Sequence, residues 1–282
     1  MLVFDRVGSA QQWCIDQKKA GKSIGLVPTM GYLHEGHLAL VEQARKQCDT
    51  VVVSIFVNPI QFGAGEDFDT YPRDLSRDQA LLEEKRVDAL FAPSISEMYP
   101  AGYHTFVEVG GEITAKLCGA SRPGHFKGVA TVVSKLFNIC LPDKAYFGQK
   151  DAQQAMVIEK MVRELNFPIE IVRVPIVREA DGLAKSSRNV YLDAEQRKQA
   201  LVLSKALAEA HSRIKQGERD VARLKEIMRA VIAASPQANI DYVEIYDAAD
   251  LSDVEQVDRN VLIALAVKIG STRLIDNLLV EV

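Results

Sequence analysis

The sequence lacks the features that mark membrane, secreted and nucleic-acid-binding proteins. Its formal charge is −4 over 282 residues, which argues against a protein that holds nucleic acid mainly through a basic field. No apolar run reaches the roughly 18 residues of a membrane helix, since the run VVVSIFV is only long enough for a strand. The N-terminus, MLVFDRVGSAQQW, lacks the basic region and apolar core of a signal peptide. We therefore expect neither a membrane nor a nucleic-acid partner.

Cysteine is scarce and scattered. Cys14, Cys48, Cys118 and Cys140 lie far apart and never form CxxC. This spacing predicts reduced, partly buried thiols in a cytoplasmic protein. The chain also has no GxSxG motif and no persuasive Cys–His arrangement. A covalent enzyme nucleophile is therefore not indicated.

The sequence does contain a regular alternation of strand-like and helix-like segments. Strands are predicted at 23–30 (ended by Pro28), 49–59, 88–94, 144–148 and 169–177, and helices at 37–48, 73–87, 128–141 and 151–165. Alternation of this kind implies right-handed crossovers and a parallel sheet. We expect an α/β fold with a Rossmann-like, doubly wound sheet over residues 1–175. In such a fold ligands bind beyond the carboxyl ends of the strands.

The pattern changes after residue 176. Residues 193–217 predict one long helix with Asp193 as N-cap and Gly217 as its stop, and 220–235 predict a second helix. Three short strands follow, at 240–247, 261–270 and 272–282, and suggest an antiparallel sheet. We expect residues 176–282 to form a smaller α+β domain that acts as a lid, with a hinge near 175–190.

Two histidines, His34 and His37, lie where the strand predicted at 23–30 is followed by a helix, in the segment PTMGYLHEGH. A helix N-terminus offers unpaired backbone N–H groups and partial positive charge, which suit phosphate. Residues at i and i+3 point the same way, so the pair could stabilise charge on a phosphoryl group in transfer. Gly36 would let a purine lie against the backbone. For an isolated HxxH, a metal pair or ordinary helix-start residues are the simpler interpretations.

The whole phrase PTMGYLHEGH is more specific than HxxH. It resembles the signature of the pantothenate synthetase family, within the superfamily of nucleotidylyltransferases and class I aminoacyl-tRNA synthetases that carry an HxGH element. Further segments match that family in order, between about residues 22 and 192: FVNPIQFG, RPGHFKGV, YFGQKDAQQ and KSSRN. The family condenses pantoate with β-alanine, using ATP, and releases AMP and pyrophosphate. The resemblance implies a C–N-forming ligase with an acyl-adenylate intermediate, Mg²⁺ carried by the ATP phosphates, no metal site on the protein, and a homodimer.

The resemblance also implies an ATP site. It gives catalytic roles to His37, His34 and Lys150, and it directs Asp151 to the ribose hydroxyls. Without the surrounding motif, Lys150 would more simply be a solvated surface charge. The ATP-binding residues implied are Met30, Gly31, Tyr32, Leu33, His34, Glu35, Gly36, His37, Gly148, Gln149, Lys150, Asp151, Val177, Lys185, Ser186, Ser187 and Arg188.

The segment KSSRN resembles the degenerate second signature of the superfamily, a loop that closes over the triphosphate. Ser186 and Ser187 supply hydroxyl donors, and Arg188 supplies a planar fork for phosphate oxygens. The chain departs from the family at Lys185, where members carry an apolar residue. Contact through the backbone alone, altered packing under the adenine and an added phosphate contact all stay open for this lysine.

Two glutamines are candidates for holding the acid. Neutral amides such as Gln61 and Gln154 can fix polar groups without the desolvation cost of a formal charge, and they leave a substrate carboxylate nucleophilic. The resemblance implies that both bind pantoate and that Gln61 also meets β-alanine. Pro28, Met30 and Val132 could face the gem-dimethyl group of pantoate or belong to the ordinary core.

Other residues of the matching segments have two interpretations each. Asn58 is either a site residue or the start of an Asn-Pro turn. Arg122 and His125 belong either to a lid or wall of the site or to a structural turn. Tyr71 either lies near the substrate or is simply a helix-start aromatic.

The resemblance leaves other functions to weigh. Another adenylyl-transferring enzyme of the superfamily would leave AMP on its product, and it would leave Gln61 and Gln154 unexplained. A nucleotide-binding regulatory protein without turnover would be favoured if His37 or Lys150 were absent. A tRNA synthetase is disfavoured by the short, acidic chain.

Overall fold

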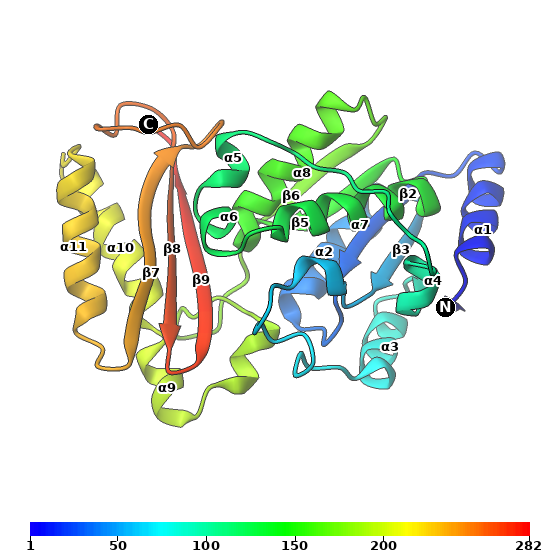
Figure 1. The fold of residues 1–282 in the computed structure, drawn as a ribbon, viewed down its shortest axis with the longest axis horizontal. Coiled ribbons are helices and arrows are strands. Elements are labelled where there is room, and N and C mark those ends of the chain that lie inside the picture. Colours follow the sequence, from blue (N-terminus) through cyan, green and yellow to red (C-terminus); the bar gives the residue numbers. More distant parts are fainter. The chain divides into compact units, whose positions relative to one another are not determined.

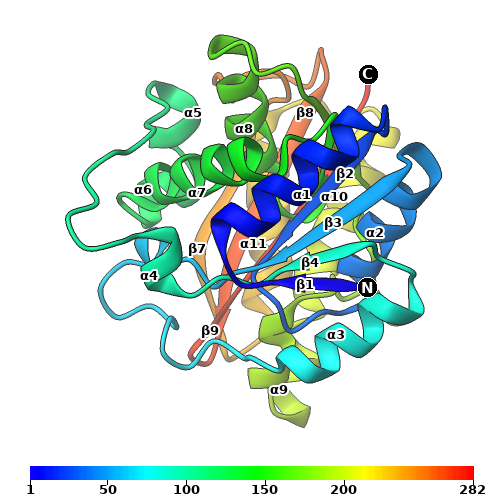
Figure 2. The same cartoon turned by 90° about the vertical axis from the view of Figure 1, so that its right-hand side faces the viewer.

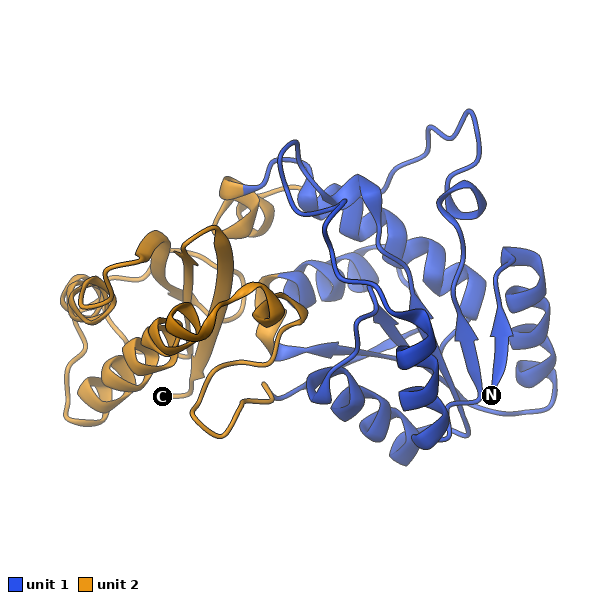
Figure 3. Ribbon diagram, turned by 90° about the horizontal axis from the view of Figure 1, so that it is seen from below, with its two compact units in different colours: residues 1–109, 122–149, 154–175 blue, residues 110–121, 150–153, 176–282 orange.

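The structure, a computed structural model, describes every residue from Met1 to Val282. The chain divides into two compact units (Figure 3). Unit 1 comprises residues 1–109, 122–149 and 154–175, and unit 2 comprises 110–121, 150–153 and 176–282. Segments 110–121 and 150–153 thus cluster with the C-terminal unit although they lie within the range expected for the first domain.

Unit 1 is built on a six-stranded parallel sheet in the order β1-β4-β3-β2-β5-β6, of which β1, β4, β3 and β2 are labelled side by side in Figure 2. From β2 the chain moves outward through β3 to β4, and it returns to the other side of β2 with β5 and β6. The order therefore reverses between β2 and β5, which confirms the doubly wound prediction and locates the switch point where such folds bind ligands. The strands are β1 (Leu2–Phe4), β2 (Ile24–Thr29), β3 (Thr50–Ile55), β4 (Ala89–Phe91), β5 (Lys144–Gly148) and β6 (Glu170–Val174).

Helices cover both faces of this sheet (Figure 1). On β3, Val52 faces a core shared with α1, α7 and α8, whereas Val51 and Val53 face a core shared with α2 and α3. A strand buried on both faces can be apolar throughout, which explains the run VVVSIFV. The helices that carry these cores, with the short α4, are α1 (Val7–Lys19), α2 (Glu35–Gln47), α3 (Leu75–Glu84), α4 (Ile95–Met98), α7 (His125–Cys140) and α8 (Ala152–Glu164). No helix is both long and apolar enough to cross a lipid bilayer.

Two features of unit 1 differ from expectation. Pro28 does not end its strand but lies inside β2, paired with Ser54. The Thr29 carbonyl accepts a hydrogen bond from the Phe56 N–H, so the alternation of the strand turns the Pro28 backbone toward β5. There the β2–β5 ladder extends only over Gly25 and Leu26, and no ladder bond is lost to proline. In addition, β1 and α1 are elements that the pattern analysis did not anticipate.

Unit 2 combines helices with a three-stranded antiparallel sheet in the order β7-β8-β9, as the sequence predicted. Helices α10 and α11 share one core with the sheet. On segment 110–121, the Cys118 thiol lies 3.4 Å from the Tyr242 hydroxyl of β7, and the Lys116 ammonium lies 4.6 Å from the centroid of the Tyr246 ring. The elements are α5 (Glu112–Ala115), α6 (Cys118–Ser121), α9 (Ala194–Gln199), α10 (Val202–Lys215), α11 (Val221–Ala233), β7 (Ala238–Asp247), β8 (Val261–Ile269) and β9 (Thr272–Val280).

The prediction of one long helix over 193–217 is wrong, although both of its ends are correct. Asp193 caps the N-terminus, and Gly217, at a φ of 100°, follows the C-terminus. In between, bonding shifts to the i→i+3 type at Ala200, and the helix breaks into α9 and α10. Ala200 is fully buried, and the neighbouring Gln199 amide oxygen accepts hydrogen bonds from Ser235 and Gln237. Tertiary contacts therefore set the break, which contains neither glycine nor proline.

Candidate active site

The connection from β2 to α2 carries the first group of predicted ATP-site residues, Met30 to His37. Gly31 has a φ of 83°, and a Cβ atom there would lie 2.9 Å from Cγ2 of Ile55, so only glycine fits. The next two backbone N–H groups, of Tyr32 and Leu33, donate to the two carboxylate oxygens of Asp78 at 2.6 and 2.7 Å. The loop is therefore held from α3 as well as by its own strand.

Asp78 is a site residue that the sequence analysis missed. Its side chain is buried, and burial raises the pKa of its carboxyl despite the hydrogen bonds from Leu33 and Tyr32. The adjacent Arg77 donates to the Leu33 carbonyl at 2.9 Å, and its guanidinium lies 5.1 Å from the centroid of the Tyr32 ring. A signal was available, because Asp78 stands four residues before the fully buried Leu82 and hence on the inward face of its helix.

The two histidines cap the start of α2 with the same ring nitrogen. The Gly36 N–H donates to Nδ1 of His34 at 3.1 Å, and the His34 N–H donates to Nδ1 of His37 at 3.3 Å. The ring centroids are 4.1 Å apart. An Nδ1 that accepts is unprotonated, so a neutral ring carries its hydrogen on Nε2. The helix start thus presents two Nε2–H donors side by side.

Asn58 and Gln61 follow β3 at the same carboxyl edge of the sheet. Asn58 is buried and donates from Nδ2 to the Gly128 carbonyl (3.1 Å) and to Oε1 of Gln61 (3.0 Å). Its Oδ1 accepts from the Tyr99 hydroxyl at 2.8 Å. Burial raises the pKa of Tyr99, so this hydroxyl remains a donor at neutral pH. Asn58 is therefore more than a turn residue, because it orients the amide of Gln61.

These hydrogen bonds fix the orientation of the Gln61 side-chain amide, that is, which way its oxygen and its nitrogen point. The Gly128 carbonyl can only accept, so Nδ2 of Asn58 must face it, and Oε1 of Gln61 must then accept from that same nitrogen. The NH₂ of Gln61 is consequently directed elsewhere, with Nε2 lying 3.3 Å from the sulfur of Met30. Helix α7 approaches closely at this point, since a Cβ on Gly128 would lie 2.5 Å from the Ile60 carbonyl oxygen. Gln61 is thus a donor toward any ligand beside Met30.

The backbone of Gln61 is held by the segment RPGHFKGV. His125 is buried, and its Nδ1 lies 2.9 Å from the Gln61 carbonyl oxygen. Arg122 lies 3.1 Å from Nε2 of His125 and forms a bidentate pair with Glu66 at 2.8 and 2.5 Å. Burial alone would raise the pKa of the Glu66 carboxyl, but hydrogen bonds and charge from Arg122 lower it overall. Arg122 and His125 therefore support the backbone of Gln61.

The remaining candidates of unit 1 have ordinary packing contacts. Val132 is buried on α7 in the main core, and Pro28 and Met30 are half-buried. Tyr71 is buried in the loop before α3 and packs edge-on against Phe62, with centroids 6.1 Å apart. Because α3 begins at Leu75 with Asp74 as its cap, Tyr71 is not a helix-start aromatic.

The segment YFGQKDAQQ joins the end of β5 to α8. Gly148 ends β5, and Gln149, Lys150 and Asp151 form a short 3-10 turn. Within unit 2, the Lys150 carbonyl accepts from the Asn277 side chain at 2.9 Å. The two glutamines that follow differ: buried Gln153 makes three hydrogen bonds to the backbone of Ile113, Lys116 and Cys118, whereas Gln154 is half-buried. Of the two, Gln153 is the one whose side chain is hydrogen-bonded to segment 110–121.

The segment around KSSRN lies in unit 2. The backbone turns back on itself, with Lys185 N–H donating to the Val177 carbonyl at 2.9 Å. The Ser186 hydroxyl accepts from the Arg188 N–H at 3.2 Å and begins a 3-10 turn that includes the buried Ser187. The Lys185 ammonium lies 2.8 Å from the Glu179 carboxylate, with 18% of the lysine side chain exposed. Lys185 therefore already has a carboxylate partner within its own loop.

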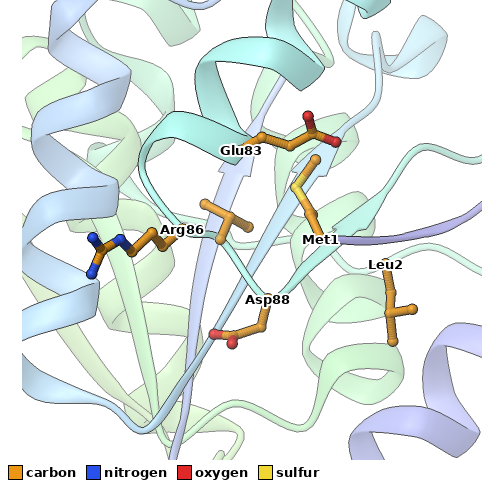
Figure 4. A pocket seen from close by; sticks show the side chains of 6 residues that line it. Met1, Leu2, Glu83, Arg86 and Asp88 are labelled. Carbon is orange, nitrogen blue, oxygen red and sulfur yellow. The ribbon is translucent and has the colours of Figure 1, made fainter.

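A hollow of about 450 Å³ opens at the other end of the sheet (Figure 4). Its lining comes from the start of β1, the last turn of α3 and the connection from α3 to β4, namely Met1, Leu2, Glu83, Arg86, Val87 and Asp88. Met1 and Leu2 begin β1 and Asp88 directly precedes β4, so the hollow lies at the amino ends of these two strands, away from the carboxyl edge that carries the histidines and Gln61. This hollow is thus not the candidate active site.

The fold and the residues at the carboxyl edge define a nucleotide-binding α/β protein: a parallel sheet with its switch point beside β2, and a helix start that offers paired imidazole donors. The chain belongs to the pantoate-beta-alanine ligase family, whose model matches residues 2–279.

Individual relatives agree with this family. The chain is 68% identical to the pantothenate synthetase of Syntrophomonas wolfei, over the full length of both. It superposes on the crystal structure of pantothenate synthetase from Thermus thermophilus with a TM-score of 0.93 and 48% identity, covering 99% of each chain. It also matches the pantoate-beta-alanine ligase of Francisella tularensis complexed with beta-gamma ATP and beta-alanine, with a TM-score of 0.81 and 34% identity, over 99% of this chain and 97% of the other.

Proposed function

We propose that this chain condenses pantoate with β-alanine at the expense of ATP, through a pantoyl adenylate, and releases AMP and pyrophosphate. Membership of the ligase family across residues 2–279 is the observation that carries this proposal. The paired Nε2–H donors at the start of α2 support it independently, since they suit a phosphoryl group.

In the first step a carboxylate oxygen of pantoate attacks the α-phosphorus of ATP, the bond from this phosphorus to the bridging oxygen of the β-phosphate breaks, and pyrophosphate leaves with the bonding pair. No covalent enzyme nucleophile is needed, only alignment and stabilisation of charge. The Nε2–H groups of His34 and His37 would donate to phosphate oxygens, Lys150 would add a positive charge, and Asp151 would meet the ribose. ATP would enter as its Mg²⁺ complex, with phosphates and water as the ligands of the metal.

The acid would be held by amides rather than by cations. Gln61 faces Met30 with its NH₂ group, which suits an acceptor on pantoate, and Gln154 would contribute a second amide. The thioether of Met30 and the side chain of Val132 would meet the gem-dimethyl group. Because neither amide carries charge, the carboxylate keeps its nucleophilicity.

In the second step the amine of β-alanine attacks the acyl carbon of the adenylate, the C–N bond forms, and AMP leaves with the bonding pair. Gln61 would also contact β-alanine. The KSSRN loop of unit 2 would bind the triphosphate before pyrophosphate leaves, and unit 2 would serve as a lid. Closure would exclude water from an intermediate that is otherwise prone to hydrolysis.

The test is isotope exchange between pyrophosphate and ATP with single acids and no amine. Pantoate should support exchange and β-alanine should not, because only the acid is adenylated. Equal exchange with any small carboxylate would remove the specific assignment. Accumulation of a product that keeps AMP after β-alanine is added would favour another adenylyl transferase, and nucleotide binding without exchange would favour a regulatory protein.

We propose in addition that the chain forms a homodimer. The resemblance to the pantothenate synthetase family implies this state, and the outer strand β1 carries the apolar side chains of Leu2 and Val3, which are 51% and 47% exposed. Light scattering should give twice the mass of the chain, about 62 kDa from its 31.2 kDa. A monomer at all concentrations would contradict the proposal.

We propose a cytoplasmic location from the thiols. The four cysteines are unpaired and buried, as suits a reducing compartment. Alkylation of the protein in denaturant, directly on cell lysis, should label four thiols per chain. Recovery of disulfides in this experiment would contradict the proposal.

A further inference from the structure

We infer that Glu66, Arg122 and His125 form a positioning device that sets the place of Gln61 and thereby the affinity for the acid. The inference rests on the proposed role of Gln61 in binding pantoate. None of the three side chains need touch the substrate, since each would act through the next and finally through the Gln61 carbonyl.

The device has only one consistent arrangement of protons. A guanidinium can only donate, so the Arg122 nitrogen 3.1 Å from Nε2 of His125 requires that Nε2 accept. The hydrogen of the neutral ring is then on Nδ1, which donates to the Gln61 carbonyl oxygen at 2.9 Å. Arg122 also reaches the same carbonyl at 3.4 Å. The arginine therefore fixes which end of the imidazole holds Gln61.

Glu66 fixes the arginine in turn. The ion pair is bidentate. The side chain of Arg122 is only 16% exposed, and that of Glu66 only 23%. Two parallel bonds restrict the orientation of the guanidinium plane more than one bond would. Lysine could keep the charge here but not the geometry.

The backbone of Gln61 depends on this support because its own turn is weakly bonded. The Gln61 N–H reaches the Asn58 carbonyl at 3.4 Å, and the Phe62 N–H reaches the Pro59 carbonyl at 3.3 Å, both beyond the usual range. Asn58 orients the side-chain amide, but it does not hold the main-chain carbonyl. A small shift of a positioned binding group can weaken its interaction with a ligand even though the group itself is intact.

The experiment compares two substitutions of one residue. In His125→Asn the amide nitrogen can take the place of Nδ1 and keep the bond to the Gln61 carbonyl, while in His125→Gln the amide reaches the place of Nε2 and the bond is lost. In pantoate-dependent pyrophosphate exchange, we expect His125→Gln to raise the pantoate KM about tenfold, as the loss of one hydrogen bond allows, and His125→Asn to raise it clearly less. The ATP KM should stay unchanged in both, and the exposed His104→Asn serves as the control.

Equal pantoate KM values for the Asn and Gln variants, or an equal rise in the ATP KM, would overturn the inference. Should His125→Gln fail to fold, Arg122→Lys is the second variant, because an ammonium can keep Glu66 but cannot also fix the imidazole. It should raise the pantoate KM with kcat changed less. Normal pantoate KM in Arg122→Lys would overturn the inference equally.

Hydrogen exchange separates this inference from the proposed function. In the ligand-free protein, the amides of Gln61 and Phe62 should exchange faster in His125→Gln than in His125→Asn, whatever the substrate is. Suppose that these amides exchange hydrogen faster in His125→Gln, but that the natural protein shows no pantoate-dependent isotope exchange between pyrophosphate and ATP. The proposed function then fails and the positioning device stands. If the amides exchange at the same rate, the device fails.

Discussion

The candidate site residues of unit 1 and of unit 2 are held in different ways. In unit 1 His34, His37 and Gln61 are oriented by backbone N–H and C=O groups and by one buried asparagine. In unit 2 Lys185 forms an ion pair with Glu179 in the same loop. Groups of the first kind are preorganised and need no rearrangement to meet a charge that develops in the reaction. A lysine of the second kind must break its ion pair with a carboxylate before it can contact a phosphate.

The comparison predicts that changes among the preorganised groups of unit 1 have larger effects than changes at the paired lysine of unit 2. The largest effect is expected at His37. In His37→Asn the amide oxygen can still accept the His34 N–H, so the helix cap survives, but the Nε2–H donor is gone. The rate of pantoate adenylation should fall about 10²–10³-fold, as for loss of one transition-state donor, while the melting temperature changes little. His37→Gln, which replaces the distal donor instead, should retain more activity. A higher adenylation rate in His37→Asn than in His37→Gln would mean that His37 acts only as a helix cap.

The second prediction concerns the glutamines. Gln61→Ala and Gln154→Ala should each raise the pantoate KM by about tenfold or more. The ATP KM should rise far less, because the proposed contacts of both glutamine side chains are with the acid. Gln153→Ala is the matched control, since Gln153 is buried and bonded to segment 110–121. It should lower stability without this selective rise in the pantoate KM. Parallel rises of both KM values in the Gln61 and Gln154 variants would contradict the assignment.

The third prediction tests how Asp78 supports the connection from β2 to α2. In Asp78→Asn an NH₂ group must face one of the two backbone N–H donors of Tyr32 and Leu33, so one buried donor loses its acceptor. The free energy of unfolding should fall by about 2 kcal/mol, as measured by urea titration. Exposed Asp69→Asn should leave it unchanged. An Asp78→Asn protein as stable as the original would show that the loop does not need the carboxylate.

The fourth prediction is a pH dependence. The folded-state pKa of Glu66 lies below its ordinary value of 4.5, so the ionised carboxyl stabilises the fold above pH 4.5, and this contribution is lost as the pH falls through the lowered pKa. Between about pH 5 and 3 the unfolding free energy should therefore fall less steeply in Glu66→Gln than in the natural protein. Acid titrations followed by circular dichroism measure both slopes. Identical slopes would mean that Arg122 does not favour the charged form.

The smallest effect is expected at Lys185. Lys185→Leu introduces the apolar side chain that the family resemblance leads us to expect here, and it removes a pair that is worth about 1 kcal/mol or less. The ATP KM should change by no more than about fivefold. Glu179→Gln removes the carboxylate partner of Lys185 and should lower the ATP KM, because the ammonium no longer has to break this ion pair to contact a phosphate. A larger effect at Lys185 than at His37 would reverse the contrast between the two units.

Much of this arrangement could be predicted from the sequence, and the exceptions share a cause. The parallel sheet, the histidine pair at a helix start and the position of Gln61 after a strand all follow from local patterns of apolar and polar residues. Asp78 was missed because its partners, Tyr32 and Leu33, lie more than forty residues away. The break between α9 and α10 was missed because Gln199 is held by Ser235 and Gln237 of a later turn.

The sequence alone determined the order of strands and helices, the family, and the chemical kinds of the candidate residues, because periodicity and short motifs are properties of neighbouring residues. Only the tertiary structure decided that both histidines accept on Nδ1, that Asn58 sets the polarity of Gln61, and that segment 110–121 belongs to unit 2. The physical reason is that a hydrogen bond needs its donor and acceptor within about 3 Å of each other, and folding alone brings such distant partners together.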